Sequence, residues 1–339
     1  MTLRPLTEPA GGVPEVIDSP EELRSALRAF DDAHGPVAID AERASGYRYG
    51  QRAYLIQIRR DGAGTALIDP LAFSDLAQVN EAIADAEWVL HAANQDLPSL
   101  REVKLQPPAL FDTELAGRLL GRQKVGLGTM VENELGLSLA KEHSAADWST
   151  RPLPQSWLRY AALDVEVLIE LRHLLEQELR TTGKLQWARE EFEAVRTMPP
   201  PPPRLDPWRR TSGTHQVRDL RGLAIVRELW LARDGAAAAA DIAPGRVLPD
   251  RAIVAAAQAK PASRQKLTEL GPFRARGARR RLDQWADAVE RALDLPEAEL
   301  PAHRAPQQRN TLPQPRAWKD RNPAAAVRLD AVRPTIRAL

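Results

Sequence analysis

Apolar residues follow two different patterns along the first 195 residues of the chain. Some form short runs of β-prone residues bounded by Gly, Asp or Pro, which is typical of buried strands. Strands are predicted at residues 36–42, 53–60, 65–70 and 88–93. Short turns join the first three, one of them containing Gly62 and Gly64, which favours an antiparallel meander that later elements complete.

Other segments repeat apolar residues every three or four positions, which predicts helices that bury one face. These helices are predicted at residues 96–103, 111–121, 127–136 and 153–180. The last is predicted as one long helix with Pro154 near its first turn, where a missing amide proton costs no hydrogen bond. Strands interleaved with helices indicate a mixed α/β layer fold.

Five consecutive prolines, Pro199 to Pro203, follow this part of the chain. Such a run cannot form a helix and adopts an extended polyproline conformation. We therefore expect the first domain to cover residues 15–195 and a linker to cover residues 196–213.

Helical periodicity dominates after this linker. Helices are predicted at residues 215–242, 249–260, 263–270 and 275–295. Together they predict a compact all-α module over residues 214–295. A looser linker is expected at 296–317, followed by one helix at 318–339 that is too short to bury a core by itself.

The composition narrows the class of protein. Hydrophobic residues make up 43% and charged residues 27% of the chain, as in soluble globular proteins, and no apolar run approaches the ~20 residues of a membrane span. Pro, Gly and Glu occur near the N-terminus where a signal peptide would be apolar, so we expect a cytoplasmic protein without membrane association. The absence of cysteine excludes disulfides, zinc-thiolate sites and thiol nucleophiles.

Charge is distributed unevenly, although the net charge is only +1. Residues 1–195 contain 20 Lys and Arg against 31 Asp and Glu, whereas residues 196–320 contain 23 against 14. An acidic first part joined to a basic second part suggests that the second part binds a polyanion while the first uses carboxylates. A solvated basic face is the alternative explanation.

Three places in the acidic part carry candidate chemistry. Asp40 and Glu42 are two residues apart in a predicted strand, so their side chains share one face. Tyr160 and Asp164 are four residues apart in a predicted helix and stack on one side of it. Asp96 follows a strand where a helix could begin. Taken singly, each has a structural explanation, namely a polar strand end, a helical pair and an N-cap.

The three places together, in this order, are much more specific than any one of them. The stretches "IDAE", "HAANQDLPSL" and "YAALDVEVL" resemble the three motifs of the ribonuclease D family of 3′–5′ exonucleases, in the branch whose acidic set is closed by a tyrosine. "LIDPL" and "AKEHSAADWSTRPLP" are similar to stretches that lie between those motifs. The resemblance covers roughly residues 15–195.

The resemblance continues into the second half of the chain. "DPWRRTSG" and the helical segments after it are similar to the linker and the helicase-and-RNase-D C-terminal (HRDC) domain of this family. The family implies a ribonuclease H-like mixed sheet flanked by helices, followed by an all-α helical bundle. Relatives often carry a second helical module, and residues 318–339 look like an incomplete start of one.

The resemblance also implies a metal-dependent mechanism with two divalent cations, Mg²⁺ or Mn²⁺. Asp40, Glu42 and Asp164 would hold the ion that activates water. Asp40 would bridge to the second ion, which Asp96 would support. Tyr160, sharing this task with Glu42, would orient the attacking water, since a phenol with a pKa near 10 suits orientation better than general-base catalysis.

We therefore expect a monomeric 3′–5′ exoribonuclease that trims RNA 3′ ends, for example of tRNA precursors or other small structured RNAs, and releases 5′-mononucleotides. Two alternatives remain. A DNA exonuclease of the same superfamily is one, because the acidic set does not distinguish ribose from deoxyribose. A non-catalytic RNA-binding scaffold is the other, although a scaffold gains nothing from carboxylates beside phosphates.

Further residues are candidates for contacts with nucleic acid. In the first domain they are Lys141, Trp148 and Arg151, and in the helical module they are Arg279, Arg280 and Arg281. The second group belongs to a basic run that also contains Arg274 and Arg276, and it is expected to neutralise phosphates without reading sequence. His91 is expected to have a structural role, and His143 to be solvated or close to the substrate.

Overall fold

The computed structural model describes residues 3–139, 145–303 and 315–338. The chain forms two compact units, the first consisting mainly of Met1–Arg204 and the second mainly of the chain after Leu205. Within the described ranges, no helix is both long enough and apolar enough to cross a membrane.

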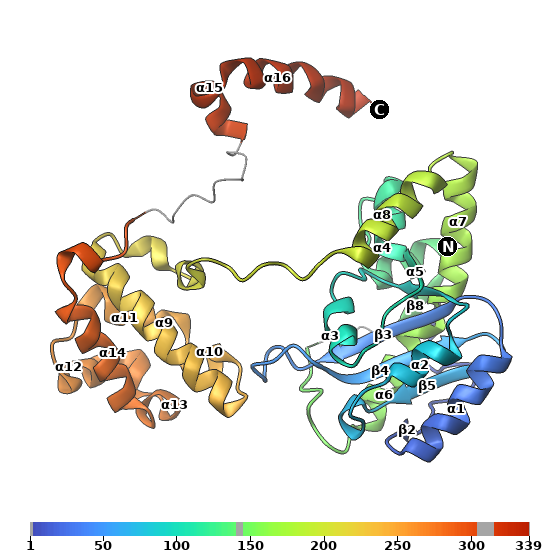
Figure 1. The fold of residues 1–339 in the computed structure, drawn as a ribbon, viewed down its shortest axis with the longest axis horizontal. Coiled ribbons are helices and arrows are strands. Elements are labelled where there is room, and N and C mark those ends of the chain that lie inside the picture. Colours follow the sequence, from blue (N-terminus) through green and yellow to red (C-terminus); the bar gives the residue numbers. More distant parts are fainter. Residues whose placement is uncertain (1–2, 140–144, 304–314, 339) are drawn as a thin grey trace. The chain divides into compact units, whose positions relative to one another are not determined.

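The first unit is built around a six-stranded mixed sheet with the strand order β2-β5-β4-β3-β6-β7 (Figure 1). Its strands are β2 (Val16–Ile17), β3 (Val37–Arg43), β4 (Ala53–Arg60), β5 (Gly64–Ile68), β6 (Glu87–Leu90) and β7 (Ala109–Asp112). The strands β3, β4 and β5 pair antiparallel, which confirms the predicted meander, and β6 and β7 extend the sheet in parallel from β3. Strand β3 therefore lies inside the sheet, with a neighbour on each side.

Helices cover this sheet. They are α1 (Pro20–Asp32), α2 (Ala77–Ala82), α3 (Leu97–Glu102), α4 (Thr113–Leu119), α5 (Leu127–Glu134), α6 (Gln155–Glu166), α7 (Leu168–Thr181) and α8 (Leu185–Thr197). Alternate residues of β5 enter different cores, with Ala66 and Ile68 in the larger and Leu67 in the smaller one. Both faces of the sheet are therefore buried. A separate parallel pair consists of β1 (Arg4–Leu6) and β8 (Leu137–Leu139).

Two predicted helices of this unit have different bounds in the structure. The long helix expected at 153–180 is broken at Val167 into α6 and α7. Buried apolar residues continue across the break, from Leu163 to Ile169, so the periodicity of the sequence did not reveal it. The helix expected from residue 111 begins only at Thr113, because Phe111 and Asp112 belong to β7.

The chain after Leu205 is helical and contains α9 (Leu220–Ala240), α10 (Pro244–Val247), α11 (Asp250–Ala259), α12 (Arg264–Glu269), α13 (Arg276–Arg279) and α14 (Leu282–Asp294). Helix α14 buries Leu282, Trp285, Val289 and Ala292 on one face, and α12 packs against it. The segment predicted as one helix at 275–295 is thus two, α13 and α14. The polyproline run has no regular secondary structure.

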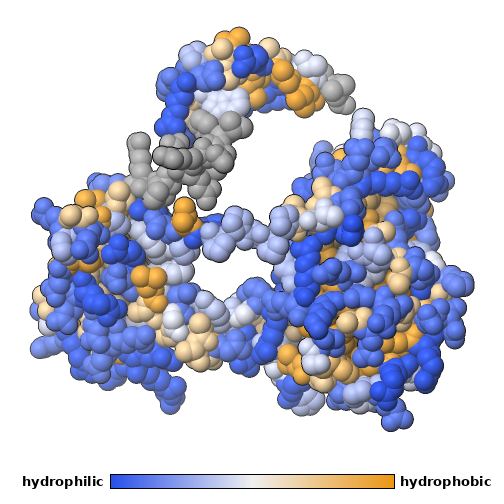
Figure 2. All heavy atoms as spheres, in the orientation of Figure 1, coloured by the Kyte–Doolittle hydropathy of each residue, from blue (hydrophilic) through white to orange (hydrophobic). Residues whose placement is uncertain are grey.

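The last described residues form α15 (Trp318–Arg321) and α16 (Pro323–Ala338), not one helix. Pro323 explains the break, because the residue before a proline is disfavoured in helical conformation. Helix α16 exposes Val327, Val332 and Ile336, and Figure 2 shows apolar residues on its surface. Short 3₁₀ helices complete the chain at Pro70–Ala72, Pro207–Arg210, Thr214–Gln216, Gly271–Arg274, Glu297–Glu299 and Pro315–Ala317.

Candidate active site

Two of the predicted carboxylates come from the middle of the sheet. Asp40 and Glu42 lie near the end of β3 and pair in register with Gln57 and Leu55 of β4. Because side chains alternate along a strand, both carboxylates point to the same face, as predicted. The register with β4 shifts directly after Glu42, which marks a bulge at Arg43.

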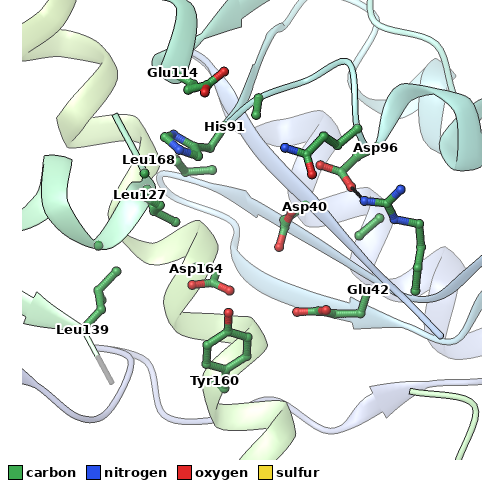
Figure 3. Close-up of a pocket in the computed structure, with 16 residues that line it drawn as sticks. Asp40, Glu42, His91, Asp96, Glu114, Leu127, Leu139, Tyr160, Asp164 and Leu168 are labelled. Atoms are coloured by element: carbon green, nitrogen blue, oxygen red, sulfur yellow. Dashed lines mark ion pairs between the residues drawn. The ribbon is translucent and has the colours of Figure 1, made fainter. Parts of the chain in front are cut away.

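Helix α6 brings the third carboxylate and the tyrosine to this face. It packs against β3, β4 and β5. One carboxylate oxygen from each of Asp40, Glu42 and Asp164 lies within 4.8 Å of the others. Tyr160, one turn earlier on α6, hydrogen-bonds to Asp164. Figure 3 shows these four side chains pointing toward one another across the gap between β3 and α6.

Asp96 stands apart from this group of three. It occupies the N-cap position of α3, but its side chain makes no capping hydrogen bond. Its carboxylate instead faces Arg43, with 3.3 Å between Oδ1 of Asp96 and the nearest guanidinium nitrogen (Figure 3). N-capping therefore does not account for the presence of Asp96.

The turn that carries Asp96 is held by a carboxylate outside the predicted set. Asp112, at the end of β7, accepts hydrogen bonds from the amides of Ala92 and Ala93 at 3.1 and 2.8 Å. It also accepts one from the amide of Leu115, which caps α4. Ala92 has a φ of 57°, a left-handed conformation that is costly for a residue with a Cβ. The Asp112 contacts stabilise this strained turn between β6 and α3.

The electrostatics of the four carboxylates are unfavourable without a cation. Burial raises the pKa of Asp40, Glu42, Asp96 and Asp164. The charge of Asp40 raises the pKa values of the other three further. The charge of Arg43 opposes part of the shift at each carboxylate of the set except Asp164. A set of buried and half-buried oxygen donors that repel one another suits a hard divalent cation.

These residues line a cavity of about 510 Å³. Its volume falls within the range of sites that bind small molecules. His91, Gln95 and Glu114 line it as well, beside Arg43 and the predicted residues. The cavity thus combines acidic groups with room for a ligand the size of a nucleotide.

Comparison with known proteins agrees with this geometry. A 3′–5′ exonuclease family model matches residues 14–180, and an HRDC domain model matches residues 222–289. Ribonuclease D of Granulibacter bethesdensis is 31% identical over 304 residues, which cover 85% of this chain and 74% of that protein. The chain belongs to the ribonuclease D family. It is therefore a 3′–5′ exoribonuclease with a ribonuclease H-like sheet and a helical HRDC domain.

Solved structures support the assignment to the ribonuclease D family. The crystal structure of Escherichia coli RNase D, described as an exoribonuclease involved in structured RNA processing, has a TM-score of 0.67 and 29% identity, covering 85% of this chain and 77% of that one. A protein from Bifidobacterium adolescentis has a TM-score of 0.85 and 41% identity, covering 95% and 82% of the two chains.

His91 combines the predicted structural role with a place in the cavity wall. Its Nδ1 lies 2.9 Å from Oγ1 of Thr113. Burial, partly opposed by the charge of Glu114, lowers the pKa of His91 from 6.5 to about 4. The ring is therefore neutral at neutral pH.

One predicted RNA contact, Trp148, is wrong. Its side chain is fully buried, with ring centroids 5.4 Å from Trp157 and 6.4 Å from Tyr160. A base cannot stack on a ring that has no exposed face, so Trp148 instead supports Tyr160 from within the core. Lys141 and His143 lie outside the described residues.

Arg151 is also corrected. Its guanidinium group donates two hydrogen bonds to Asp69 and one each to the carbonyl oxygens of Tyr54, Trp148 and Thr150. These use all five N–H donors of an arginine, so none is left for a phosphate. Arg151 ties the loop to β4 instead of contacting RNA.

The basic run of the helical module has a different local structure from the one expected. Arg279 ends α13, Arg280 is its C-cap, and Arg281 is the N-cap of α14. The three residues therefore form a corner between two helices. Arg279 and Arg280 are exposed, and Arg281 is partly exposed. Their contact with RNA stays a prediction.

Sequence reasoning missed Arg43, Gln95 and Glu114. A signal was present for Arg43, which directly follows the Asp-x-Glu pair and provides a positive charge beside two carboxylates. Gln95 and Glu114 carried no distinct signal, because neither belongs to a spacing that the sequence singles out.

Proposed function

We propose that this protein hydrolyses the 3′-terminal phosphodiester bond of RNA with two divalent cations, Mg²⁺ or Mn²⁺, and releases 5′-mononucleotides. The observation that carries the proposal is the convergence of Asp40, Glu42 and Asp164, whose oxygens lie within 4.8 Å of one another. They come from two distant parts of the chain, β3 and α6, and Glu42 is buried while Asp40 and Asp164 are half-buried.

The donor set fits the ions. All four carboxylates offer oxygen, which Mg²⁺ and Mn²⁺ prefer, and the chain has no cysteine that would favour a softer metal. Bound cations would relieve the repulsion that raises the carboxylate pKa values. When bound, the ions would supply a water that loses its proton near neutral pH and would neutralise charge at the phosphorus.

We assign each residue a separate task. Asp40, Glu42 and Asp164 would hold the ion that activates water, and Asp96 together with Asp40 would support the second ion. Tyr160 orients the water. Burial and the charges of Asp164 and Glu42 raise the pKa of Tyr160, so its phenol stays protonated and is unsuited to act as a base.

The proposed substrates are tRNA precursors or other small structured RNAs. The printed description of the Escherichia coli relative, structured RNA processing, supports this class. The exposed Arg279 and Arg280 and the partly exposed Arg281 add positive charge that would bind phosphates without regard to sequence. We propose an exonuclease domain at residues 15–195 and an HRDC-like domain at 214–295, joined by the linker at 196–213.

The metal mechanism is tested with RNA labelled at its 5′ end, with Mn²⁺ or with EDTA. We expect progressive shortening that EDTA abolishes, and a loss of at least about a hundredfold in Asp40→Asn and Asp164→Asn. Asp61→Asn is the matched control, because this aspartate is exposed and lies outside the cavity wall. Shortening in EDTA, or wild-type rates in Asp40→Asn, would exclude the mechanism.

The substrate class is tested separately. Single-stranded RNA, single-stranded DNA of the same sequence and a tRNA with a 3′ extension are compared under the same conditions. We expect both RNAs to be shortened and the extended tRNA to stop at its folded stem. Shortening of the DNA at the same rate would contradict a preference for ribose.

A further inference from the structure

Arg43 is the positively charged residue of the active site. Among the described residues that line the cavity it is the single arginine or lysine, and it adjoins a group of carboxylates. The bulge at the end of β3 places it there. Its side chain is 25% exposed, so the guanidinium group reaches both the cavity and solvent.

The ion pair between Arg43 and Asp96 divides the acidic set. Three carboxylates, those of Asp40, Glu42 and Asp164, already lie close enough to share a cation. Asp96 does not belong to that group, and within the described residues its ion-pair partner is Arg43, at 3.3 Å. The structure therefore shows a fourth carboxylate that is paired with the positively charged side chain of Arg43.

A divalent cation and the Arg43 guanidinium group compete for the same carboxylate. If Asp96 ligated a cation in the present arrangement, two positive charges would lie a few ångströms apart, where they repel one another strongly. Arg43 can move away because its long side chain is partly exposed. Asp96 is 6% exposed and fixed at the start of α3, so the arginine is the partner that moves.

We propose that Arg43 is a positioning and substrate-binding residue. It pairs with Asp96 until a divalent cation takes that carboxylate, and the released guanidinium group then binds a phosphate of the RNA. The planar fork of N–H donors on arginine matches phosphate oxygens. The inference rests on the proposed metal-dependent function. It adds an order of binding to that function, in which the cation binds before Arg43 contacts the phosphate.

The consequence is a coupling between metal and RNA. A residue that hinders the cation and later assists the RNA has opposite effects on the two affinities when it is removed. A purely structural ion pair would affect both in the same direction, through loss of stability or of the α3 position. The signs of the two changes therefore distinguish the two roles.

The experiment measures both affinities in the full-length protein. Mn²⁺ binding is followed by titration calorimetry. RNA binding is followed by fluorescence anisotropy with Mn²⁺ over a series of salt concentrations, on a short RNA with phosphorothioates at its 3′ end, which is checked for integrity afterwards. We expect Arg43→Gln to bind Mn²⁺ at least about fivefold more tightly and RNA at least about fivefold more weakly. The slope of the logarithm of the RNA binding constant against the logarithm of the salt concentration, called the salt slope below, should become shallower by about 0.7. This is the value of one phosphate contact on a single strand.

Arg122→Gln is the matched control. Arg122 is similarly exposed, at 26%, and pairs with Glu134 and Glu178, but it does not line the cavity. We expect it to change neither affinity. If Arg43→Gln fails to fold, Arg43→Met takes its place, since it keeps the aliphatic stem and lacks the charge.

The outcomes separate the two proposals. Equal or weaker Mn²⁺ binding in a folded Arg43 variant, or unchanged RNA binding, would overturn the role of Arg43 alone. If the wild-type protein shows no Mn²⁺ binding that Asp40→Asn removes, the proposed metal mechanism fails instead. Opposite changes in the two affinities would support the inference.

Discussion

The carboxylates in the cavity are unfavourable in their charged form at the positions where the fold places them. Burial and the neighbouring carboxylates raise the pKa values of Glu42, Asp96 and Asp164, and the charge of Arg43 compensates only part of this rise at Glu42 and Asp96. These carboxylates therefore lower the free energy of unfolding of the protein. The size of this loss depends on the pH and on whether a metal ion is bound.

The stability of the metal-free protein should fall as the pH rises. The folded-state pKa values lie above the ordinary values of 3.8 for Asp and 4.5 for Glu, so the folded protein retains protons that the unfolded chain has released. The stability from these groups is complete below about pH 4 and is lost as the pH rises through the raised values. The expected loss is about 1.4 kcal/mol per pH unit for each proton concerned.

Thermal melting in EDTA over a pH series measures this effect. Asp164→Asn should show a shallower fall than the wild type, and added Mn²⁺ should flatten the wild-type curve. Identical slopes for wild type and Asp164→Asn would show that this carboxylate is not strained in the folded state.

The hydroxyl of Tyr160 is expected to orient water without losing its own proton. Tyr160→Phe should lower kcat by about a hundredfold and leave Mn²⁺ affinity unchanged. Because the pKa of Tyr160 is raised, the alkaline side of the pH profile should be the same in the variant and the wild type. Tyr54→Phe, which removes a hydroxyl outside the cavity wall, is the control for which wild-type kcat is expected. A shift of the alkaline limb in Tyr160→Phe would assign the phenol a titrating role.

At the scale of elements, the site depends on how a strand, a helix and a turn are held. Strand β3 is fixed by pairing on both sides, and α6 packs directly on it. The turn before α3 lacks such support, includes a left-handed Ala92 and relies on Asp112 for two amide hydrogen bonds. Asp112 is therefore a structural residue on which the position of Asp96 depends.

Asp112→Ala should destabilise the protein by about 2–3 kcal/mol, because it leaves three amides without their acceptor. Asp112→Asn keeps one oxygen acceptor and should lose less. Denaturant unfolding measures the change, and Asp75→Ala, which removes a partly exposed acceptor for the amide of Ala77, is a control with a smaller expected loss. Equal losses for Asp112 and Asp75 would contradict the special role of the turn.

At the scale of the whole molecule, charge is divided between the two halves of the chain. The exonuclease part is acidic, and the part after residue 195 is basic. Since RNA binding to phosphates depends strongly on salt, this division predicts that the basic helical part contributes affinity while the acidic part contributes the cleavage site.

Replacing Arg279, Arg280 and Arg281 together by glutamine should weaken RNA binding and lower its salt slope by about 2, corresponding to three phosphate contacts on a single strand. Cleavage of very short RNAs should persist, because these arginines do not line the cavity. The matched variant with three lysines keeps the charges and should retain the slope. An unchanged slope in the glutamine variant would place the phosphate contacts elsewhere.

The sequence by itself determined the acidic set of the site with its tyrosine, and their local grouping. A strand repeats every two residues and a helix every 3.6, so Asp40 with Glu42, and Tyr160 with Asp164, had to share a face wherever these elements formed. The order of the three motifs then indicated the family. Such relations depend on backbone geometry over a few residues, and this is why they can be read without a structure.

The tertiary structure alone decided where the long helix breaks and which distant residues the individual side chains contact. It showed the break at Val167, the burial of Trp148, the saturated donors of Arg151 and the pairing of Asp96 with Arg43. Each depends on atoms far apart in the sequence, and neither periodicity nor composition records which distant neighbour a side chain meets. Packing between β3, α6 and the turn before α3 brought the separate motifs into one cavity.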